Sequence, residues 1–134
     1  MERNIILDFV NAINGHNLET ISSMLSDGHT FTDAHNNSIT GKENMKSAWK
    51  TYFEWFPDYT IEISEIVQAE TCYAVFGFAH GTYRNLHNEQ KSNHFHLPAA
   101  WRAVTANEKI ELWQVYCDTK VPFDIMHENI QPRI

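Results

Sequence analysis

Residues 45–56 constrain the fold most strongly, because they carry a continuous apolar stripe at helical spacing. The stripe consists of Met45, Ala48, Trp49, Tyr52, Phe53 and Phe56. Steps of three and four residues place these side chains on one face of a helix. Thr40 and Glu43 precede the stripe with the spacing of a capping box, and Pro57 ends it. A helix face with so many aromatic rings must be buried against another large apolar surface.

The second half of the chain is expected to form that surface as a β-sheet, because its composition is typical of β-structure. Strand-forming residues are concentrated in four long segments, residues 59–68, 71–84, 92–106 and 109–119. The short gap at Asn107 and Glu108 indicates a hairpin turn, and residues 85–91 are expected to form a polar loop. A tail that opens near Pro122 is expected to hold one further helical turn.

Two shorter helices and a short strand are predicted before the aromatic helix. The first helix covers residues 5–13, where apolar side chains recur with helical period. The second is capped by Asn17 and is stopped by Asp27 and Gly28. Residues 29–34 then alternate as a short strand.

The order of these elements predicts an α+β fold in a single domain. Four antiparallel strands must bury one face, and the aromatic helix is the only large apolar partner for it. A cone-shaped, strongly curved and mostly antiparallel sheet that wraps this helix would leave a cavity, because one helix cannot fill it. We expect residues 1–134 to form one domain with its core at residues 5–118 and a C-terminal tail at residues 119–134.

Composition and charge exclude several classes of function. The chain is 43% hydrophobic and 13% aromatic, which suits a real core, and its formal net charge is -7. A negative field repels phosphate backbones and anionic membrane surfaces, so we expect neither nucleic acid nor a membrane as partner. Cys72 and Cys117 give no disulfide framework and are expected to be reduced thiols. No signal peptide is evident at the start, and we expect a cytoplasmic protein.

Several motifs, in their order along the chain, resemble a known family. The end of the first helix (residues 9–14), Phe31-Thr32-Asp33, a helix that opens at Gly41, residues 56–59 and the last strand (residues 109–118) follow the SnoaL-like pattern. The chain is therefore similar to SnoaL-like and ketosteroid isomerase-like members of the nuclear transport factor 2-like superfamily, which has a cystatin-like fold. The resemblance covers residues 5–118. It implies a deep pocket for a small hydrophobic molecule, with steroid isomerases, polyketide cyclases and epoxide hydrolases as the relatives that carry out chemistry.

At the matching positions, this chain lacks a central group of each of these chemistries. Phe9 stands where the isomerases carry a hydrogen-bond-donating tyrosine, and phenylalanine has no such proton. Ala99 and Ala100 occupy the region where isomerases and cyclases place an aspartate, and Val115 lies near the aspartate of the epoxide hydrolases. Loss of one oxyanion donor alone costs about two to three orders of magnitude in rate. The resemblance therefore implies only a general class of function: proton transfer on a hydrophobic ligand, or simple binding of such a ligand.

Asp33 is the first candidate catalytic residue. It shares a strand face with Phe31, which should point into the core, and an apolar wall would raise the pKa of a carboxylate toward the range of a useful base. In the isomerases the matching aspartate is the general base. In the alternative interpretation, Asp33 caps the turn before Asn36 and Asn37 and contacts no ligand. His80 is the second candidate, as an acid opposite Asp33, if its strand face is the concave one.

His94 and His96 form a His-x-His pair on one strand face, a spacing that can bind zinc when a third ligand is close. Phe95, Leu97 and Trp101 have the opposite parity and are expected to point inward. We therefore expect the two histidines to face outward or into an interface, and we expect neither a metal nor another cofactor. Only a bulge near Pro98 would reverse this orientation.

The predicted ligand pocket is lined mainly by aromatic and aliphatic side chains. Its expected lining is Phe9, Trp49, Phe53, Phe56, Phe78, Leu97, Ala99, Trp101, Trp113 and Val115. Walls of this kind suit a flat, largely apolar ligand, including a cyclic one of polyketide or steroid type. Two functions stay open: an acid-base enzyme of the isomerase, cyclase or hydrolase type without a cofactor, and a non-catalytic binding or dimeric interaction module. Because the fold commonly dimerises through the convex sheet face, we also expect a homodimer.

Overall fold

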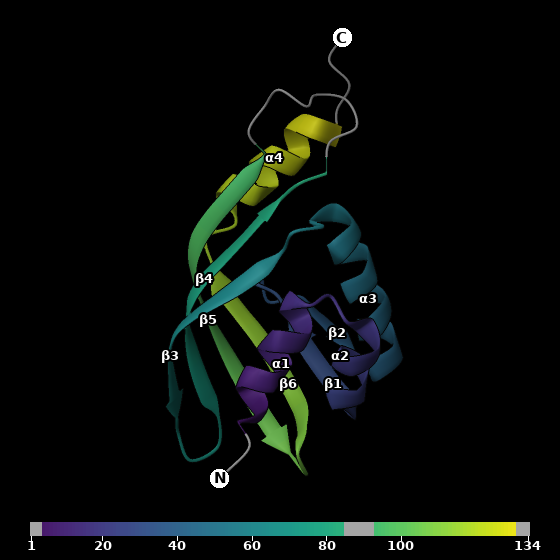
Figure 1. Ribbon diagram of the computed structural model, residues 1–134, viewed down its shortest axis with the longest axis vertical. Helices are drawn as coiled ribbons and strands as arrows, with labels where there is room; N and C mark the ends of the chain where they lie inside the picture. Colours follow the sequence, from purple (N-terminus) through teal and green to yellow (C-terminus); the bar gives the residue numbers. More distant parts are fainter. Residues whose placement is uncertain (1–3, 85–92, 131–134) are drawn as a thin grey trace.

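The computed structural model describes residues 4–84 and 93–130, which form helices against one side of a curved sheet (Figure 1). The helices in these ranges are α1 (Ile5–Asn14), α2 (Leu18–Met24), α3 (Lys42–Trp55) and α4 (Lys120–Ile130). The strands are β1 (Leu25–Thr32), β2 (Ser38–Thr40), β3 (Thr60–Gln68), β4 (Tyr73–Thr82), β5 (His94–Ala106) and β6 (Lys109–Cys117). The predicted α+β class, with three helices in the first half of the chain, is confirmed. The predicted polar loop at residues 85–91 lies outside the described residues.

The sheet has six strands in the order β2-β1-β6-β5-β4-β3. The β1–β6 pair is parallel and the other pairs are antiparallel. At the β5–β6 turn, Asn107 and Glu108 have φ values of 53° and 62°. Two consecutive positive φ angles are typical of the tight hairpin turn whose twist matches that of its strands. The predicted hairpin at these residues is confirmed.

The core lies between the inner sheet face and the helices. Trp113 on β6 meets Phe9 of α1 edge to face, with ring centroids 5.0 Å apart, and stacks on Trp101 of β5 at 6.1 Å. Phe56, directly after α3, meets Phe95 of β5 at 5.4 Å. These rings come from distant parts of the sequence, so their burial fixes the position of the helices against the sheet.

The predicted capping box at the start of α3 is wrong. Gly41 is the residue before the first turn, and no side chain caps the helix there. Thr40 is instead the last residue of β2, and its hydroxyl lies 3.4 Å from that of Thr30. The chain must turn from strand to helix within one residue, with a φ of 103° at Gly41. Glycine adopts this angle at low cost, so the backbone geometry is met by Gly41 and not by a polar cap.

The boundary between α2 and β1 also differs from the sequence prediction. The helix ends at Met24, and β1 starts at once with Leu25, which pairs with Ile110. The register of β1 against β6 shifts between Leu25 and Thr30. Asp27 and Gly28 therefore lie in an irregular part of the strand, not at a helix end. A bulge absorbs extra residues without ending a strand, which single-sequence turn signals do not distinguish.

The C-terminal segment contains more helix than the single turn predicted. The carboxylate of Asp118 accepts a hydrogen bond from the Lys120 amide at 2.9 Å and so caps α4. Lys120 also forms an ion pair with Asp124 at 2.7 Å, one turn further on. Pro122 lies in the first turn, where a missing N–H costs nothing. Within the described ranges, no helix is long and apolar enough to cross a membrane.

His29 on β1 is a fully buried histidine that sequence patterns did not single out as part of the core. Its Nδ1 donates to the Ile110 carbonyl oxygen at 2.8 Å, which assigns the tautomer. Its Nε2 has no hydrogen-bond partner among the described residues. Desolvation by burial lowers the pKa of His29, and the bond to Ile110 opposes this only in part. The folded protein therefore holds His29 as a neutral imidazole.

We expect acidification to destabilise the fold through His29. In the unfolded chain, the imidazole binds a proton near its ordinary pKa of 6.5, whereas the folded pKa is lower. Between these two values the unfolded state holds more protons, so stability is lost as the pH falls below 6.5, by at most about 1.4 kcal/mol per pH unit. Urea unfolding across this range should give a flatter pH dependence for His29→Gln than for the wild type. His127→Gln, at an exposed position, should keep the wild-type slope; equal slopes for wild type and His29→Gln would contradict the assignment.

Candidate functional site

The inner face of β5 and β6 changes from fully buried to partly exposed along the strands. The cross-strand pair Ala103–Trp113 is almost free of solvent. Towards the end of β6 that leads into α4, Val115 and Cys117 are half-buried, and Leu97 on β5 is half-buried as well. All three have the same parity as the buried inner residues of their strands. Solvent therefore reaches the inner face at this end of the sheet, which we call the open end.

Two tyrosines face each other at the open end. Tyr52 comes from α3 and Tyr59 from the turn that leads into β3, and their rings meet edge to face with centroids 4.9 Å apart. Tyr52 is half-buried and Tyr59 is 6% exposed. Desolvation raises the pKa of both phenols well above the ordinary value, and nearby Cys117 raises both further. The contact between the two phenols lowers the pKa of Tyr52 and raises the pKa of Tyr59, and desolvation is the largest cause in both. Both side chains are therefore neutral hydrogen-bonding groups at any physiological pH.

Cys117 completes this cluster from β6. Burial is the main cause that raises the pKa of its thiol, and the neighbouring Asp118 raises it further. A thiol with a raised pKa stays protonated and is a poor nucleophile. The open end can therefore donate hydrogen bonds from neutral groups but holds no charge on Tyr52, Tyr59 or Cys117. Sequence analysis did not identify this cluster, because Tyr52 and Tyr59 meet only through the turn at Pro57 and Asp58.

Asp33 lies in the β1–β2 turn. Its Oδ1 accepts hydrogen bonds from the amides of His35 and Asn37, both at 2.9 Å, and its own amide donates to the Asn37 carbonyl oxygen. This is the turn-capping arrangement that the sequence offered as the alternative. One carboxylate oxygen thus stabilises the turn, and the role of Asp33 as a base stays a prediction.

The same turn contacts α4 and the segment before it. His35 Nε2 lies 2.7 Å from the Thr119 hydroxyl, and the imidazole stacks on Phe123 at 5.1 Å. Ile125 and Met126 pack on the core from α4. The Asp33 turn and α4 therefore stand together beside the open end.

The predicted pairing of His80 with Asp33 is wrong. On β4, Val75, Gly77 and Ala79 are buried, whereas His80 has the opposite parity and pairs with outward-facing His96. In the sheet, β4 is separated from β1 by β5 and β6, three interstrand steps and hence about 14 Å. His80 thus lies on the outer face and cannot form a dyad with Asp33.

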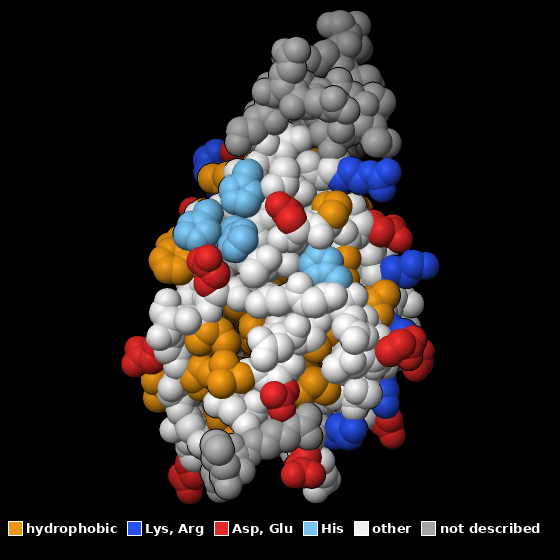
Figure 2. Space-filling view, in the orientation of Figure 1, with side chains coloured by type: hydrophobic (Ala, Val, Ile, Leu, Met, Phe, Trp, Pro, Cys, Tyr) orange, Lys and Arg blue, Asp and Glu red, His pale blue; other side chains and the backbone are white. Residues whose placement is uncertain are grey.

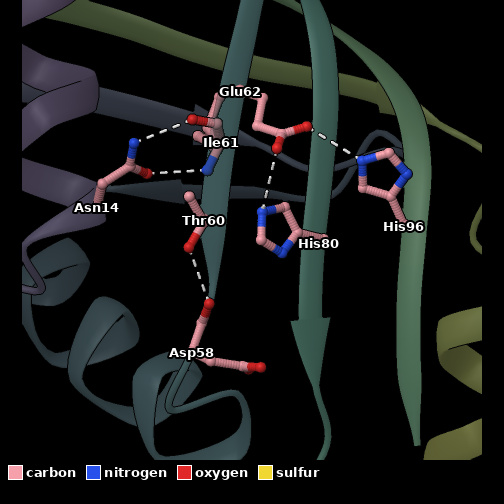
Figure 3. A network of polar contacts seen from close by, with 7 residues as sticks. All are labelled: Asn14, Asp58, Thr60, Ile61, Glu62, His80 and His96. Carbon is pink, nitrogen blue, oxygen red and sulfur yellow. Dashed lines mark hydrogen bonds and ion pairs between the residues drawn. The ribbon is translucent and has the colours of Figure 1, made fainter.

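On the outer face, Glu62 of β3 interacts with two histidines (Figure 3). Its carboxylate lies 3.1 Å from His96 Nε2 and 3.8 Å from His80 Nε2. The hydrogen bond with His96, and next the charge of His80, lower the pKa of Glu62. His94 bonds Thr82 nearby at 2.8 Å, and Figure 2 shows histidine side chains gathered on the surface. In the described parts of the chain, no three His, Cys, Asp or Glu residues are placed to hold a metal ion.

The strand register at Pro98 explains why His80 and His96, the two partners of Glu62, lie on the outer face. The β4–β5 pairing runs without a shift from Thr82–His94 to Tyr73–Ala103, so no bulge reverses the parity. Phe78, predicted in the pocket lining, is corrected by the same register. It stacks on His96 at 4.8 Å on the outer face.

The remaining predicted lining residues lie on the inner side. The buried ones are Phe9, Trp49, Phe53, Phe56, Ala99, Trp101 and Trp113. Leu97 and Val115 are the two that are half-buried. Apart from Phe78, the residues predicted to line the pocket thus lie on the inner face of the sheet or pack against it. Only those at the open end, Leu97 and Val115, are partly exposed to solvent.

Asn14 anchors the edge strand of this inner face (Figure 3). Its side-chain amide donates to the Ile61 carbonyl oxygen at 2.9 Å, and its Oδ1 accepts from the Ile61 amide at 2.8 Å. On the next turn, His16 stacks on Phe53 at 4.0 Å and bonds the Tyr59 carbonyl oxygen at 2.9 Å. These contacts fix the backbone that carries Tyr59.

The family and fold comparisons agree with this architecture. The model of the SnoaL-like domain matches residues 6–113. No curated protein matches the chain by sequence. A protein of ketosteroid isomerase-like fold from Catenulispora acidiphila, solved in complex with trimethylamine, has a TM-score of 0.78 at 16% identity, covering 98% of this chain and 96% of that one.

Two further solved structures carry names that imply chemistry. A candidate SnoaL-like polyketide cyclase from Shewanella denitrificans has a TM-score of 0.79 at 12% identity, covering 92% of this chain and 95% of that one. An LEH-like epoxide hydrolase from M. tuberculosis has a TM-score of 0.74 at 13% identity, covering 94% of this chain and 89% of that one. Identities this low establish the shared fold, and the residues of the site must decide the activity.

Proposed function

Because this chain belongs to the SnoaL-like domain family, we propose that it binds a small, largely apolar molecule at the open end of its inner sheet face. The observation that carries this proposal is the partial exposure of Leu97, Val115 and Cys117 on a face that is otherwise buried. Apolar side chains left accessible inside a concave face gain free energy when a ligand removes them from water. Neutral Tyr52 and Tyr59 supply polar contacts without a charge.

The site favours binding over catalysis. Asp33 uses one oxygen to cap its turn, and His80 lies on the other face. Phe9, Ala99 and Val115 carry no group that transfers a proton. Asp33→Asn keeps an oxygen for the turn amides but removes the base, so we expect ligand affinity to change less than about threefold. A turnover that Asp33→Asn abolishes would favour the acid-base enzyme instead.

Filling the open end should block binding. Val115→Trp places a large ring on the inner face, so we expect affinity for an apolar probe such as tetralin to fall at least about tenfold. Intrinsic tryptophan fluorescence or calorimetry measures this affinity, and native mass spectrometry of fresh protein detects any co-purified ligand. Leu112→Trp is the matched control, because Leu112 is also half-buried on β6 but faces outward. Equal affinity in the two variants would contradict a site on the inner face.

A second proposal is a homodimer formed through the outer sheet face. Phe76 and Tyr116 flank Ala100 in adjacent strands and are 44% and 51% exposed. Contiguous exposed rings on a sheet often mark an interface, and a second copy is the commonest partner. We expect Phe76→Asp to shift the protein to monomer in light scattering. Val121→Asp, at an equally exposed position on α4, should leave the mass unchanged; a monomeric wild type would contradict the dimer.

A further inference from the structure

α4 is the most loosely held helix in the described part of the chain. Each of α1, α2 and α3 has at least three buried residues, whereas none of the described side chains of α4, residues 120–127, is buried. Ile125 and Met126 are half-buried, and Phe123 is 53% exposed. Movement of α4 away from the sheet therefore exposes little additional apolar surface, and its opening costs little free energy.

α4 stands at the open end, opposite the β5–β6 turn (Figure 1). It follows β6 after only two residues, Asp118 and Thr119, where Val115 and Cys117 of that strand are half-buried. The half-buried side chains of α4 pack against the same core as Leu97 and Val115 do. A ligand that reaches the inner face at this end therefore passes α4.

His35 fastens α4 to the β1–β2 turn. Its Nε2 lies 2.7 Å from the Thr119 hydroxyl, and its imidazole stacks on Phe123 with ring centroids 5.1 Å apart. The turn itself is fixed by Asp33, whose carboxylate accepts hydrogen bonds from the amides of His35 and Asn37. These contacts join two segments that lie far apart in the sequence, and none of them involves the inner face of the sheet.

Two further polar contacts hold α4 together without tying it to the sheet. The Asp118 carboxylate accepts from the Lys120 amide, and Lys120 pairs with Asp124 one turn further on. Both contacts lie within the helix and the link before it. α4 can therefore turn as a unit about this two-residue link, the kind of short connection that absorbs a hinge motion.

We propose that α4 is a hinged lid over the open end, that the contacts of His35 with Thr119 and Phe123 are its latch, and that a ligand enters and leaves when the latch opens. The inference rests on the proposed binding site and adds the route by which that site exchanges its ligand. It also gives the Asp33 turn a role that needs no proton transfer, because this turn carries the latch.

The latch does not touch the ligand, so weakening it should change the rates of exchange and not the affinity. When binding and release both pass through the open state, a weaker latch raises both rates by the same factor, which cancels in their ratio. His35→Ala removes the hydrogen bond and the ring stack, so we expect the association and dissociation rates of tetralin to rise about tenfold. The dissociation constant should stay within about twofold of the wild-type value. Stopped-flow tryptophan fluorescence measures both rates.

Thr119→Val separates the two parts of the latch. It removes the hydroxyl but keeps the stack of His35 on Phe123, so both rates should rise by only about threefold. Val121→Ala is the matched control, because Val121 lies on the same helix, is 44% exposed and is not part of the latch. It should leave both rates unchanged.

Hydrogen exchange gives a second measurement, without ligand. The amides of α4 should exchange faster in His35→Ala than in the wild type, whereas those of β5 should exchange at the wild-type rate. Equal exchange of α4 in the two proteins would contradict the latch.

The possible failures are distinct. If tetralin does not bind the wild type, the proposed binding site fails and the lid fails with it. If tetralin binds but its rates are unchanged in His35→Ala, the site stands and the lid is overturned. A weaker affinity with an unchanged association rate would make α4 a fixed wall of the site, which also overturns the lid.

Discussion

Gly77→Ala should destabilise the protein by about 3 kcal/mol or more, although it adds only one methyl group. A β-carbon at Gly77 would overlap the Glu62 carbonyl oxygen and lie 2.9 Å from the Glu62 carbonyl carbon. Both are backbone atoms of β3, so no side-chain rotation relieves the contact. The register of β3 against β4 shifts between Ile63 and Glu65, next to this point. The edge strand must therefore move away from β4 as a whole.

Urea unfolding of Gly77→Ala measures this loss. Gly28→Ala is the matched control, because a β-carbon at Gly28 would meet nothing within 4 Å. The control should unfold within about 1 kcal/mol of the wild type. If Gly77→Ala were as stable as Gly28→Ala, the close approach of β3 to β4 would be incorrect.

Trp113→Ala should cost about 3–5 kcal/mol of unfolding free energy, enough to unfold much of a marginally stable domain. Trp113 is 1% exposed and joins α1 to the sheet through Phe9 and Trp101. Truncation leaves a cavity that these rings can fill only in part. Because Trp113 lies next to the open end on β6, the variant should also lose affinity for tetralin.

Thermal and urea unfolding of Trp113→Ala, with Trp55→Ala as control, tests this core assignment. Trp55 is the last residue of α3 and is 43% exposed, so its truncation removes little buried area. We expect less than about 1 kcal/mol for the control. Similar losses in the two variants would contradict the central position of Trp113.

Helical and strand periodicity predicted the architecture because each element buries one face. The aromatic stripe of α3 can be buried only against the inner sheet face, and Phe56 packs on Phe95 in this way. Alternation along β5 likewise placed Phe95 and Trp101 inward and His96 outward. Where the apolar pattern was unambiguous, the side of each residue followed from it.

Alternation along β4 separates its residues into two faces, but it does not show which of the two faces the core. Phe76, Phe78 and His80 share one parity, and two phenylalanines suggested the inner face. The inner positions are instead Val75, Gly77 and Ala79, which are buried. At Gly77 the backbone of β3 leaves no room even for a β-carbon. Exposed phenylalanines therefore misled the assignment of His80.

The cluster of Tyr52, Tyr59 and Cys117 in the candidate site could not be predicted from the sequence. Tyr52 was predicted as a core residue and Tyr59 as part of a family motif. The turn after α3 brings their rings together, and Cys117 of β6 lies close enough to raise the pKa of both. A contact among three residues from three different elements leaves no periodic pattern in the sequence.

Methyl chemical shifts of the protein with added tetralin test the central claim, a ligand site on the inner face, most directly. Leu97 and Val115 report on the inner face at the open end, while Leu112 and Val104 are half-buried on the outer face of the same two strands. We expect saturable shifts at Leu97 and Val115, with Leu112 and Val104 unchanged. Shifts confined to Leu112 and Val104, or none at any of the four, would contradict a ligand site on the inner face.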